Sequence, residues 1–315
     1  MFRAPAATSA NRKSRFLLAE ISAWRTFALI VLLAVLAVHS VAAKSEVYVV
    51  VVPVANMYVE PSEQKEMVSQ ALYGSVVKLL VTRGEWSKIQ TPDDQYKGWT
   101  PSRYLRLVQS GPGYATSGKV VQVESLFANL YREADVRQRK PLITIPFDSR
   151  LEVTAEGTGS DAGWLQVRLP DQRRAWVQVG DVVSDPQPLS IPESIELAKR
   201  FLGLPYLWGG RSSFGFDCSG FTQMLLRRRG IQLPRDANRQ AAWSGLIAVN
   251  RTDLQAGDLV FFGLAARKIE HTGMYIGDGQ FIHDATEGHP GVQISRLDDE
   301  PWTRLLIACR RVKEK

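Results

Sequence analysis

The first half of this 315-residue chain repeats itself, which restricts that half to two copies of one small fold. Three segments recur in the same order: Ala55–Glu60 (ANMYVE) returns as Ala128–Glu133 (ANLYRE), Trp86–Asp93 as Trp164–Asp171, and Gly98-Trp99 as Ala175-Trp176. The three offsets are 73, 78 and 77 residues, which differ only as loop insertions would make them differ. Two similar units of about 70 residues are therefore expected here.

Each copy has the pattern of a small barrel. Apolar and polar residues alternate in runs such as 76–81 and 150–153, and Gly, Pro and Asp interrupt them, as in short antiparallel strands. We place the copies at residues 44–110 and 118–185, on either side of a Gly/Ser/Pro linker at 110–113. The Trp motif and the closing Gly-Trp strand resemble bacterial SH3-like wall modules, although most of the tryptophans are expected to serve core packing.

Beyond Pro188 the pattern changes to helices followed by strands, which predicts an α+β domain over residues 190–315. Helices are expected from the Ser190 cap to Gly203, over 218–229 and over 236–243. Strands are expected over 258–262, 271–276, 280–283, 292–294 and 305–309, with Asp278-Gly279 as a hairpin turn between the second and third.

Residues 1–43 are expected to be an export signal. A basic stretch ends at Arg25, an apolar run follows over 27–38, and small residues at 40–43 suit cleavage. An uncleaved membrane anchor is the alternative, because the basic region is long. We expect the protein in the cell envelope, in the periplasm or outside the cell.

The net charge of +7 gives little support for nucleic-acid binding. Residues 1–43 hold five basic side chains against Glu20, so +4 of the charge lies in the predicted signal. The remaining +3 is ordinary for a chain of this length, and no nucleic-acid partner is expected.

One cysteine and two histidines have the order of a thiol nucleophile, its base and an orienting group. Cys218 opens an apolar helix, where unpaired N–H groups favour a thiolate. His271 starts one predicted strand and His283 ends the next, so the hairpin brings them together. We expect His271 to pair with the thiolate as an imidazolium.

Two other uses of these residues remain open. A disulfide between Cys218 and Cys309 would silence the nucleophile, although Cys309 has the setting of a small buried hydrophobe. Zinc would need further ligands such as Asp284 or His289, and no ligand-pair spacing is present. We therefore expect no metal and no cofactor.

Residues 190–315 resemble the NlpC-type papain-like cysteine peptidases of bacterial cell walls. The resemblance lies in five segments: Leu204–Gly210 (LPYLWGG), Phe216–Phe221 (FDCSGF), Leu233–Asp236 (LPRD), Gly257–Leu259 (GDL) and His271–Ile276 (HTGMYI). It implies Cys218 as nucleophile, His271 as base and His283 as the third polar member. It also implies an oxyanion site made by Tyr206 and the backbone N–H of Cys218.

With two SH3-like modules ahead of this domain, the chain resembles the γ-D-glutamyl-L-diamino acid endopeptidases, a group also called dipeptidyl-peptidase VI. The resemblance implies cleavage, through an acyl-thioester, of the γ-D-Glu to diamino-acid bond in murein peptides with a free N-terminal L-Ala. Ser219 and Asp236 match positions that hold this amine, as do Glu60 and Tyr96 of the first module. Glu63 and Tyr58 are near alternatives for the latter two.

Three rivals remain open. The first is the same chemistry on intact, glycan-bound stems, with the modules as wall anchors. The second is an acyltransferase or amidase on the same fold, and the third is a wall-binding protein without catalysis. We expect a monomer whose partners are murein peptides, with association to the cell wall as a further option.

Overall fold

The computed structural model describes Met1 and residues 47–108, 113–137, 140–265 and 268–313. The predicted export signal at 1–43 lies outside the described residues, apart from Met1. Among the described residues, no helix has both the length and the apolar character needed to cross a membrane.

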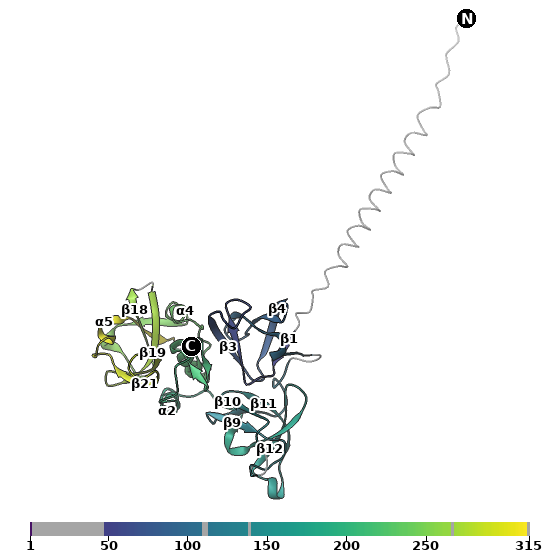
Figure 1. Cartoon of the computed structure of the whole chain (residues 1–315). Coiled ribbons are helices and arrows are strands. Elements are labelled where there is room, and N and C mark those ends of the chain that lie inside the picture. Colours follow the sequence, from purple (N-terminus) through teal and green to yellow (C-terminus); the bar gives the residue numbers. More distant parts are fainter. Residues whose placement is uncertain (2–46, 109–112, 138–139, 266–267, 314–315) are drawn as a thin grey trace. The chain divides into compact units, whose positions relative to one another are not determined.

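The first copy of the repeat is a seven-stranded antiparallel sheet (Figure 1). Its strands are β1 (Val47–Val50), β2 (Val54–Tyr58), β3 (Met67–Leu72), β4 (Val76–Arg83), β5 (Trp86–Gln90), β6 (Lys97–Pro101) and β7 (Leu105–Leu107). They lie in the order β3-β2-β6-β5-β4-β1-β7, and a 3₁₀ turn, η1 (Ser102–Tyr104), precedes the last strand.

The second copy repeats this plan strand for strand. Its strands are β8 (Val120–Val123), β9 (Phe127–Leu130), β10 (Ile143–Pro146), β11 (Arg150–Glu156), β12 (Trp164–Arg168), β13 (Arg174–Gln178) and β14 (Val182–Ser184). Two 3₁₀ turns, η2 (Gly159–Asp161) and η3 (Val179–Asp181), join them. The orders β13-β12-β11-β8-β14 and β10-β9 are those of the first copy, with one β9–β13 contact reduced to an isolated bridge.

The repeated motif residues make the same packing contacts in both copies. Tyr58 meets Trp86 edge to face at 5.8 Å, and Tyr131 meets Trp164 in the same way at 5.5 Å. The apolar residue before each tyrosine, Met57 in the first copy, is fully buried. The two-module prediction is therefore confirmed, and packing explains why the motif is repeated.

The third part is an α+β domain built on one antiparallel sheet in the order β17-β22-β18-β19-β20-β21. These strands are β17 (Leu246–Val249), β18 (Leu259–Ala265), β19 (Lys268–Gly277), β20 (Gln280–Ala285), β21 (Gly291–Arg296) and β22 (Leu306–Val312). The other elements are α2 (Ile191–Lys199), α3 (Cys218–Arg228), α4 (Ala237–Ala241), α5 (Trp302–Leu305), η4 (Arg251–Asp253) and the short hairpin β15 (Arg211–Ser212) and β16 (Gly215–Phe216).

Local sequence accounts for these elements. Ser190 and Glu193 form a capping box at the start of α2. Asp278 and Gly279 both have positive φ, as the two-residue turn between β19 and β20 requires.

The helix predicted over 236–243 is shorter in the structure, because Asp236 occupies the N-cap position and the helix ends at Ala241. Strand β17, which pairs with β22, was not predicted. The α+β fold class is confirmed.

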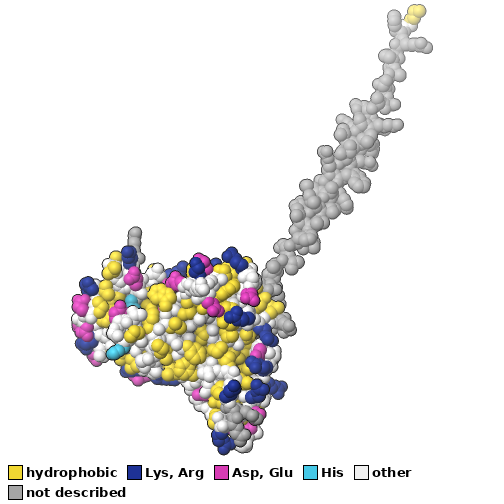
Figure 2. All heavy atoms as spheres, in the orientation of Figure 1, with side chains coloured by type: hydrophobic (Ala, Val, Ile, Leu, Met, Phe, Trp, Pro, Cys, Tyr) yellow, Lys and Arg dark blue, Asp and Glu magenta, His cyan; other side chains and the backbone are white. Residues whose placement is uncertain are grey.

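Helices α2 and α3 pack on one face of the sheet, where Phe201, Phe216 and Phe221 meet edge to face. A second core on the opposite face holds Phe262, Trp302 and their neighbours. Hydrophobic side chains occupy much of the middle of the face seen in Figure 2, with basic and acidic side chains interspersed around them.

Candidate active site

Cys218 is placed by the helix that it opens. Asp217 is the N-cap of α3, and its Oδ1 accepts a hydrogen bond from the N–H of Gly220 at 2.7 Å. A side chain at Gly220 would bring a Cβ to 2.1 Å from the carbonyl oxygen of Gly210, so only glycine allows this approach. The cysteine is thereby held at the buried helix start, 6% exposed.

The Sγ of Cys218 lies against the backbone on either side of His271. Its thiol donates to the carbonyl oxygen of Glu270 at 3.8 Å, and the N–H of Thr272 favours the thiolate. No direct Cys218–His271 hydrogen bond occurs in the described part of the chain. Loose contacts of this kind are ordinary in free enzymes and tighten when substrate binds.

The two histidines are in direct contact. His271 Nε2 lies 2.8 Å from His283 Nδ1, which leaves His271 Nδ1 as the ring nitrogen available to the thiol. Trp302 stacks on His271 at 5.1 Å and meets His283 edge-on at 4.8 Å. The indole therefore shields the contact between the imidazoles from water, and His283 is fully buried.

Burial dominates the charge state of this group. It raises the pKa of Cys218 to about 12, and the nearby carboxylate of Asp217 acts in the same direction. Burial also lowers the pKa of His271 to about 4, and it lowers that of His283 further below its ordinary value. Burial thus favours the neutral thiol and the neutral imidazole over the expected thiolate–imidazolium pair, which stays a prediction.

Tyr206 lies beside the segment that leads into Cys218. It forms a parallel bridge with Phe216, and the N–H of Leu207 donates to the Phe216 carbonyl at 2.7 Å. Burial raises the pKa of Tyr206 above its ordinary value, and the neighbouring ionisable groups of Cys218 and Asp217 act in the same direction. The hydroxyl stays protonated and is a hydrogen-bond donor.

Arg235 was not predicted, although it lies in the LPRD motif. Its guanidinium is 2% exposed and binds both oxygens of Asp217, at 2.9 and 2.6 Å, and the hydroxyl of Ser219 at 2.8 Å. It also contacts Ser69 Oγ of the first barrel at 3.3 Å. Arg235 thus ties the start of α3 to the barrel.

The first barrel contacts the α+β domain next to the predicted site. The Tyr96 hydroxyl faces Asp236, and burial together with this carboxylate raises the pKa of Tyr96 above its ordinary value. Trp208 is 62% exposed, and its Nε1 donates to Glu66 Oε1 of the barrel at 3.0 Å. The Trp208–Glu66 contact was not predicted.

The remaining predicted residues differ in placement. Ser219 is 6% exposed, and its hydroxyl is engaged by Arg235 and Asp217. Glu60 is exposed and pairs with Lys65 at 3.1 Å, and no contact within the described residues joins it to Asp236. Its assignment to the site stays a prediction.

The two cysteines are both free, so the disulfide alternative is wrong. Within the described residues, no group of three or more His, Cys, Asp and Glu side chains has an arrangement that holds a metal ion.

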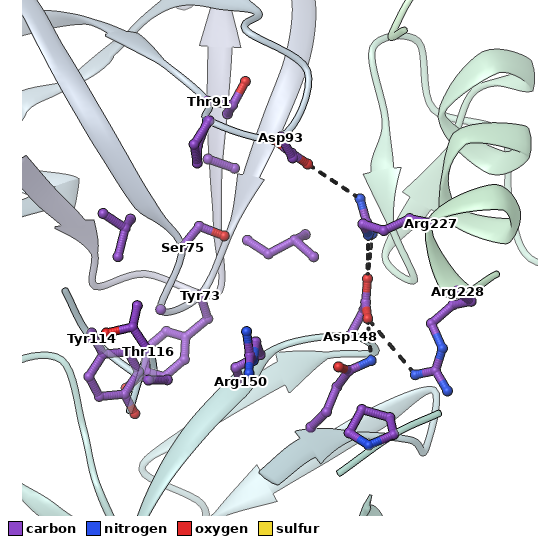
Figure 3. A pocket seen from close by; sticks show the side chains of 18 of the residues that line it. Tyr73, Ser75, Thr91, Asp93, Tyr114, Thr116, Asp148, Arg150, Arg227 and Arg228 are labelled. Atoms are coloured by element: carbon purple, nitrogen blue, oxygen red, sulfur yellow. Dashed lines mark hydrogen bonds and ion pairs between the residues drawn. The ribbon is translucent and has the colours of Figure 1, made fainter. Parts of the chain in front are cut away.

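A cavity of about 470 Å³ lies away from Cys218, where both barrels meet the α+β domain (Figure 3). Charged side chains that line this cavity form ion pairs with one another. Arg227 binds Asp148 at 2.7 Å and Asp93 at 3.7 Å. Arg228 lies 3.9 Å from Asp148 on the other side. These ion pairs connect the three parts of the chain, and none of the predicted site residues lines this cavity.

Comparisons with known proteins agree with this arrangement. The model of the NlpC/P60 family matches residues 203–311, and that of the bacterial dipeptidyl-peptidase Sh3 domain matches residues 57–105. The chain is 35% identical over 257 residues to a gamma-D-glutamyl-L-lysine dipeptidyl-peptidase of Bacillus cereus, covering 77% of this chain and 74% of the relative. A Bacillus subtilis protein of the same name is 31% identical, with 77% and 80% covered.

Solved structures are similar as well. An NlpC/P60 family protein from Bacillus cereus superposes with a TM-score of 0.74 at 27% identity, covering 84% of this chain and 99% of that one. An NlpC/P60 endopeptidase from Photobacterium damselae shares the fold, with a TM-score of 0.59 at 16% identity, covering 83% and 70%.

Proposed function

The chain belongs to the NlpC/P60 family of cysteine peptidases, and we propose that it hydrolyses the γ-D-Glu to diamino-acid bond of murein peptides. Two relatives named for a γ-D-glutamyl-L-lysine substrate support this choice of bond. The observation that carries the proposal is the contact between His271 and His283 next to the Cys218 thiol. The export signal predicted for residues 1–43 assigns the activity to the cell envelope.

The proposed reaction begins with a proton transfer, because burial favours the neutral forms of the thiol and the imidazole. As Cys218 Sγ adds to the scissile carbonyl carbon, its proton passes to His271 Nδ1, and the imidazolium is stabilised through Nε2 by His283. The carbonyl oxygen becomes an oxyanion, which the Tyr206 hydroxyl and the Cys218 N–H stabilise.

Collapse of this intermediate breaks the C–N bond. The leaving amine of the diamino acid takes the proton from His271, which leaves an acyl-thioester on Cys218. Water then attacks the thioester carbonyl while His271 accepts its proton. The returning thiolate takes that proton back, so the enzyme is regenerated and one water is consumed.

The free N-terminal ammonium of the substrate is the second element of the proposal. Asp236 and Tyr96 come together from the α+β domain and the first barrel, and Ser219 lies one residue from the nucleophile. A carboxylate and a hydroxyl that converge from two sides suit an ammonium group, since a buried unpaired charge is costly. Glu60 is proposed as a further carboxylate of this subsite.

The test is mass spectrometry of the products from L-Ala-γ-D-Glu-diaminopimelate and from the L-lysine analogue. Cleavage after γ-D-Glu, lost in Cys218→Ala, is the expected result. Acetylation of the terminal amine is expected to reduce cleavage at least tenfold. If acetylation has no effect, the amine subsite is wrong and intact glycan-bound stems become the preferred substrate. If an added amine acceptor is acylated in preference to water, the enzyme is a transferase.

A further inference from the structure

Ser295 is the next hydrogen-bonding group beyond the two histidines. It lies on β21, beside β20, and its Oγ is 2.9 Å from His283 Nε2. His283 therefore has a partner on each ring nitrogen, His271 on Nδ1 and Ser295 on Nε2. His271, His283 and Ser295 form one hydrogen-bonded row that ends on β21.

Among the described residues, Ser295 is the side chain that is hydrogen-bonded to His283 Nε2. Gln293 is the direct cross-strand neighbour of His283, but its amide donates to the carbonyl oxygens of Glu287 at 2.8 Å and of His289 at 3.2 Å. Trp302 and Phe281 cover the histidine, with ring centroids at 4.8 and 4.4 Å. The serine hydroxyl is thus the polar group to which this buried imidazole is tied.

The donor-to-acceptor direction of the hydrogen bonds in this row decides whether His271 can act as a base. His271 Nδ1 accepts the thiol proton only if the ring proton sits on Nε2, from which it donates to His283 Nδ1. A neutral His283 that accepts at Nδ1 must carry its own proton on Nε2, and Ser295 Oγ is the acceptor for it. The opposite direction would put a proton on His271 Nδ1 and block the transfer.

We propose that Ser295 is a positioning residue of this peptidase, which accepts the Nε2–H of His283 and so fixes the tautomers and ring orientations of both histidines. It acts through His283 and does not touch the substrate. Orienting groups of this kind raise the rate of the chemical step and leave substrate binding nearly unchanged. The inference rests on the proposed function for its kinetic readout and on the histidine rings alone for its spectroscopic one.

The experiment compares Ser295→Ala, Ser295→Thr and the wild-type full chain. With L-Ala-γ-D-Glu-lysine as substrate, Ser295→Ala is expected to lower kcat about tenfold, the effect of one hydrogen bond, with KM within about twofold. Ser295→Thr keeps the hydroxyl and is expected to restore most of kcat. Ser160→Ala, at an exposed serine of the second barrel, is the matched control and should behave as wild type.

Nitrogen-15 NMR of the histidine rings, without substrate, gives the second readout. In the wild type both rings should carry their proton on Nε2, and in Ser295→Ala a mixture of tautomers should appear at unchanged thermal stability. Wild-type tautomers together with wild-type kcat in Ser295→Ala would overturn the inference, as would equal losses in the Ala and Thr variants. If the wild type fails to cut the peptide while the tautomers still shift in Ser295→Ala, the proposed substrate is wrong and the role of Ser295 stands.

Discussion

His271 and His283 meet nitrogen to nitrogen, with Nε2 of the first 2.8 Å from Nδ1 of the second, under the indole of Trp302. An imidazole both donates and accepts hydrogen bonds, so this contact can fix the ring orientation of His271 and stabilise a positive charge on it. The role proposed for His283 follows from this contact.

Replacing His283 tests the contact directly. His283→Ala removes the partner of His271 Nε2, and we expect kcat to fall about 100-fold with a smaller change in KM. His283→Asn offers an amide at the same place and should retain more activity. Steady-state kinetics on the tripeptide measure both, with circular dichroism to verify folding. A wild-type kcat in His283→Ala would exclude the role.

The reactivity of Cys218 should follow that of a buried thiol. Because burial raises its pKa to about 12, iodoacetamide should alkylate the free enzyme slowly at pH 7, with a rate that rises about tenfold per pH unit up to pH 10. Mass spectrometry after timed quenching, with Cys218→Ala to subtract alkylation of Cys309, gives the rate. A rate that is already constant between pH 5 and 8 would instead demonstrate a stable thiolate–imidazolium pair.

Stability should decline in acid because the surroundings of both histidines favour the neutral imidazole. The pKa of His271 falls to about 4 in the folded state, whereas in the unfolded chain it returns to about 6.5. The unfolded state thus binds more protons between these values, and the free energy of unfolding drops by about 1.4 kcal/mol per pH unit for each histidine as pH falls from 6.5. Urea titrations at several pH values measure this dependence. The free energy of unfolding should vary less steeply with pH in His283→Asn than in the wild type. In exposed His289→Ala its pH dependence should be unchanged.

Asp284 should have the opposite pH dependence. Neither of its oxygens has a hydrogen-bond partner among the described residues, and burial, followed by the charge of Asp217, raises its pKa to about 8. The folded state keeps a proton that the unfolded chain loses near pH 4, so this contribution to stability shrinks by about 1.4 kcal/mol per unit up to pH 8. Asp284→Asn should therefore gain stability over wild type as pH rises from 5 to 8. The gain should be absent in Asp299→Asn, at an exposed position.

Asp236→Asn should alter the preference for a free amine. Loss of the carboxylate that faces Tyr96 is expected to raise KM for the free tripeptide about tenfold and to leave the N-acetylated peptide nearly unaffected. The ratio of kcat/KM for the two substrates is the measurement. Glu196→Gln, at an exposed residue of α2 that pairs with Lys199, is the control. An unchanged ratio in Asp236→Asn would remove Asp236 from the subsite.

The sequence patterns predicted those structural features that depend on residues close together along the chain. The repeated Tyr-Trp pair, the Asp278-Gly279 turn and the helix start at Cys218 are local, and the hairpin that joins the two histidine strands follows from them. These features were sufficient to predict an α+β domain after two barrels, and a nucleophile followed by two histidines.

Contacts between distant segments were not predictable in this way. Ser295 reaches His283 through the register of β20 and β21, and Arg235 reaches Ser69 across a domain boundary. The rise in the pKa of Cys218 was not predicted, for a related reason. The helix start favours a negative charge, but the degree of burial, which outweighs it, depends on the whole fold.

The seam between the first barrel and the peptidase domain is built from buried polar groups. Gln70 Oε1 accepts from the N–H of Arg211 at 2.8 Å and from the hydroxyl of Ser212 at 3.1 Å, all three residues being less than 5% exposed. Excising the barrel would break these hydrogen bonds and expose a face of the peptidase domain that is buried in the whole chain. Truncation intended to widen the substrate range should therefore lower the stability of the remaining domain, whereas exchange of single side chains at the site leaves these contacts in place.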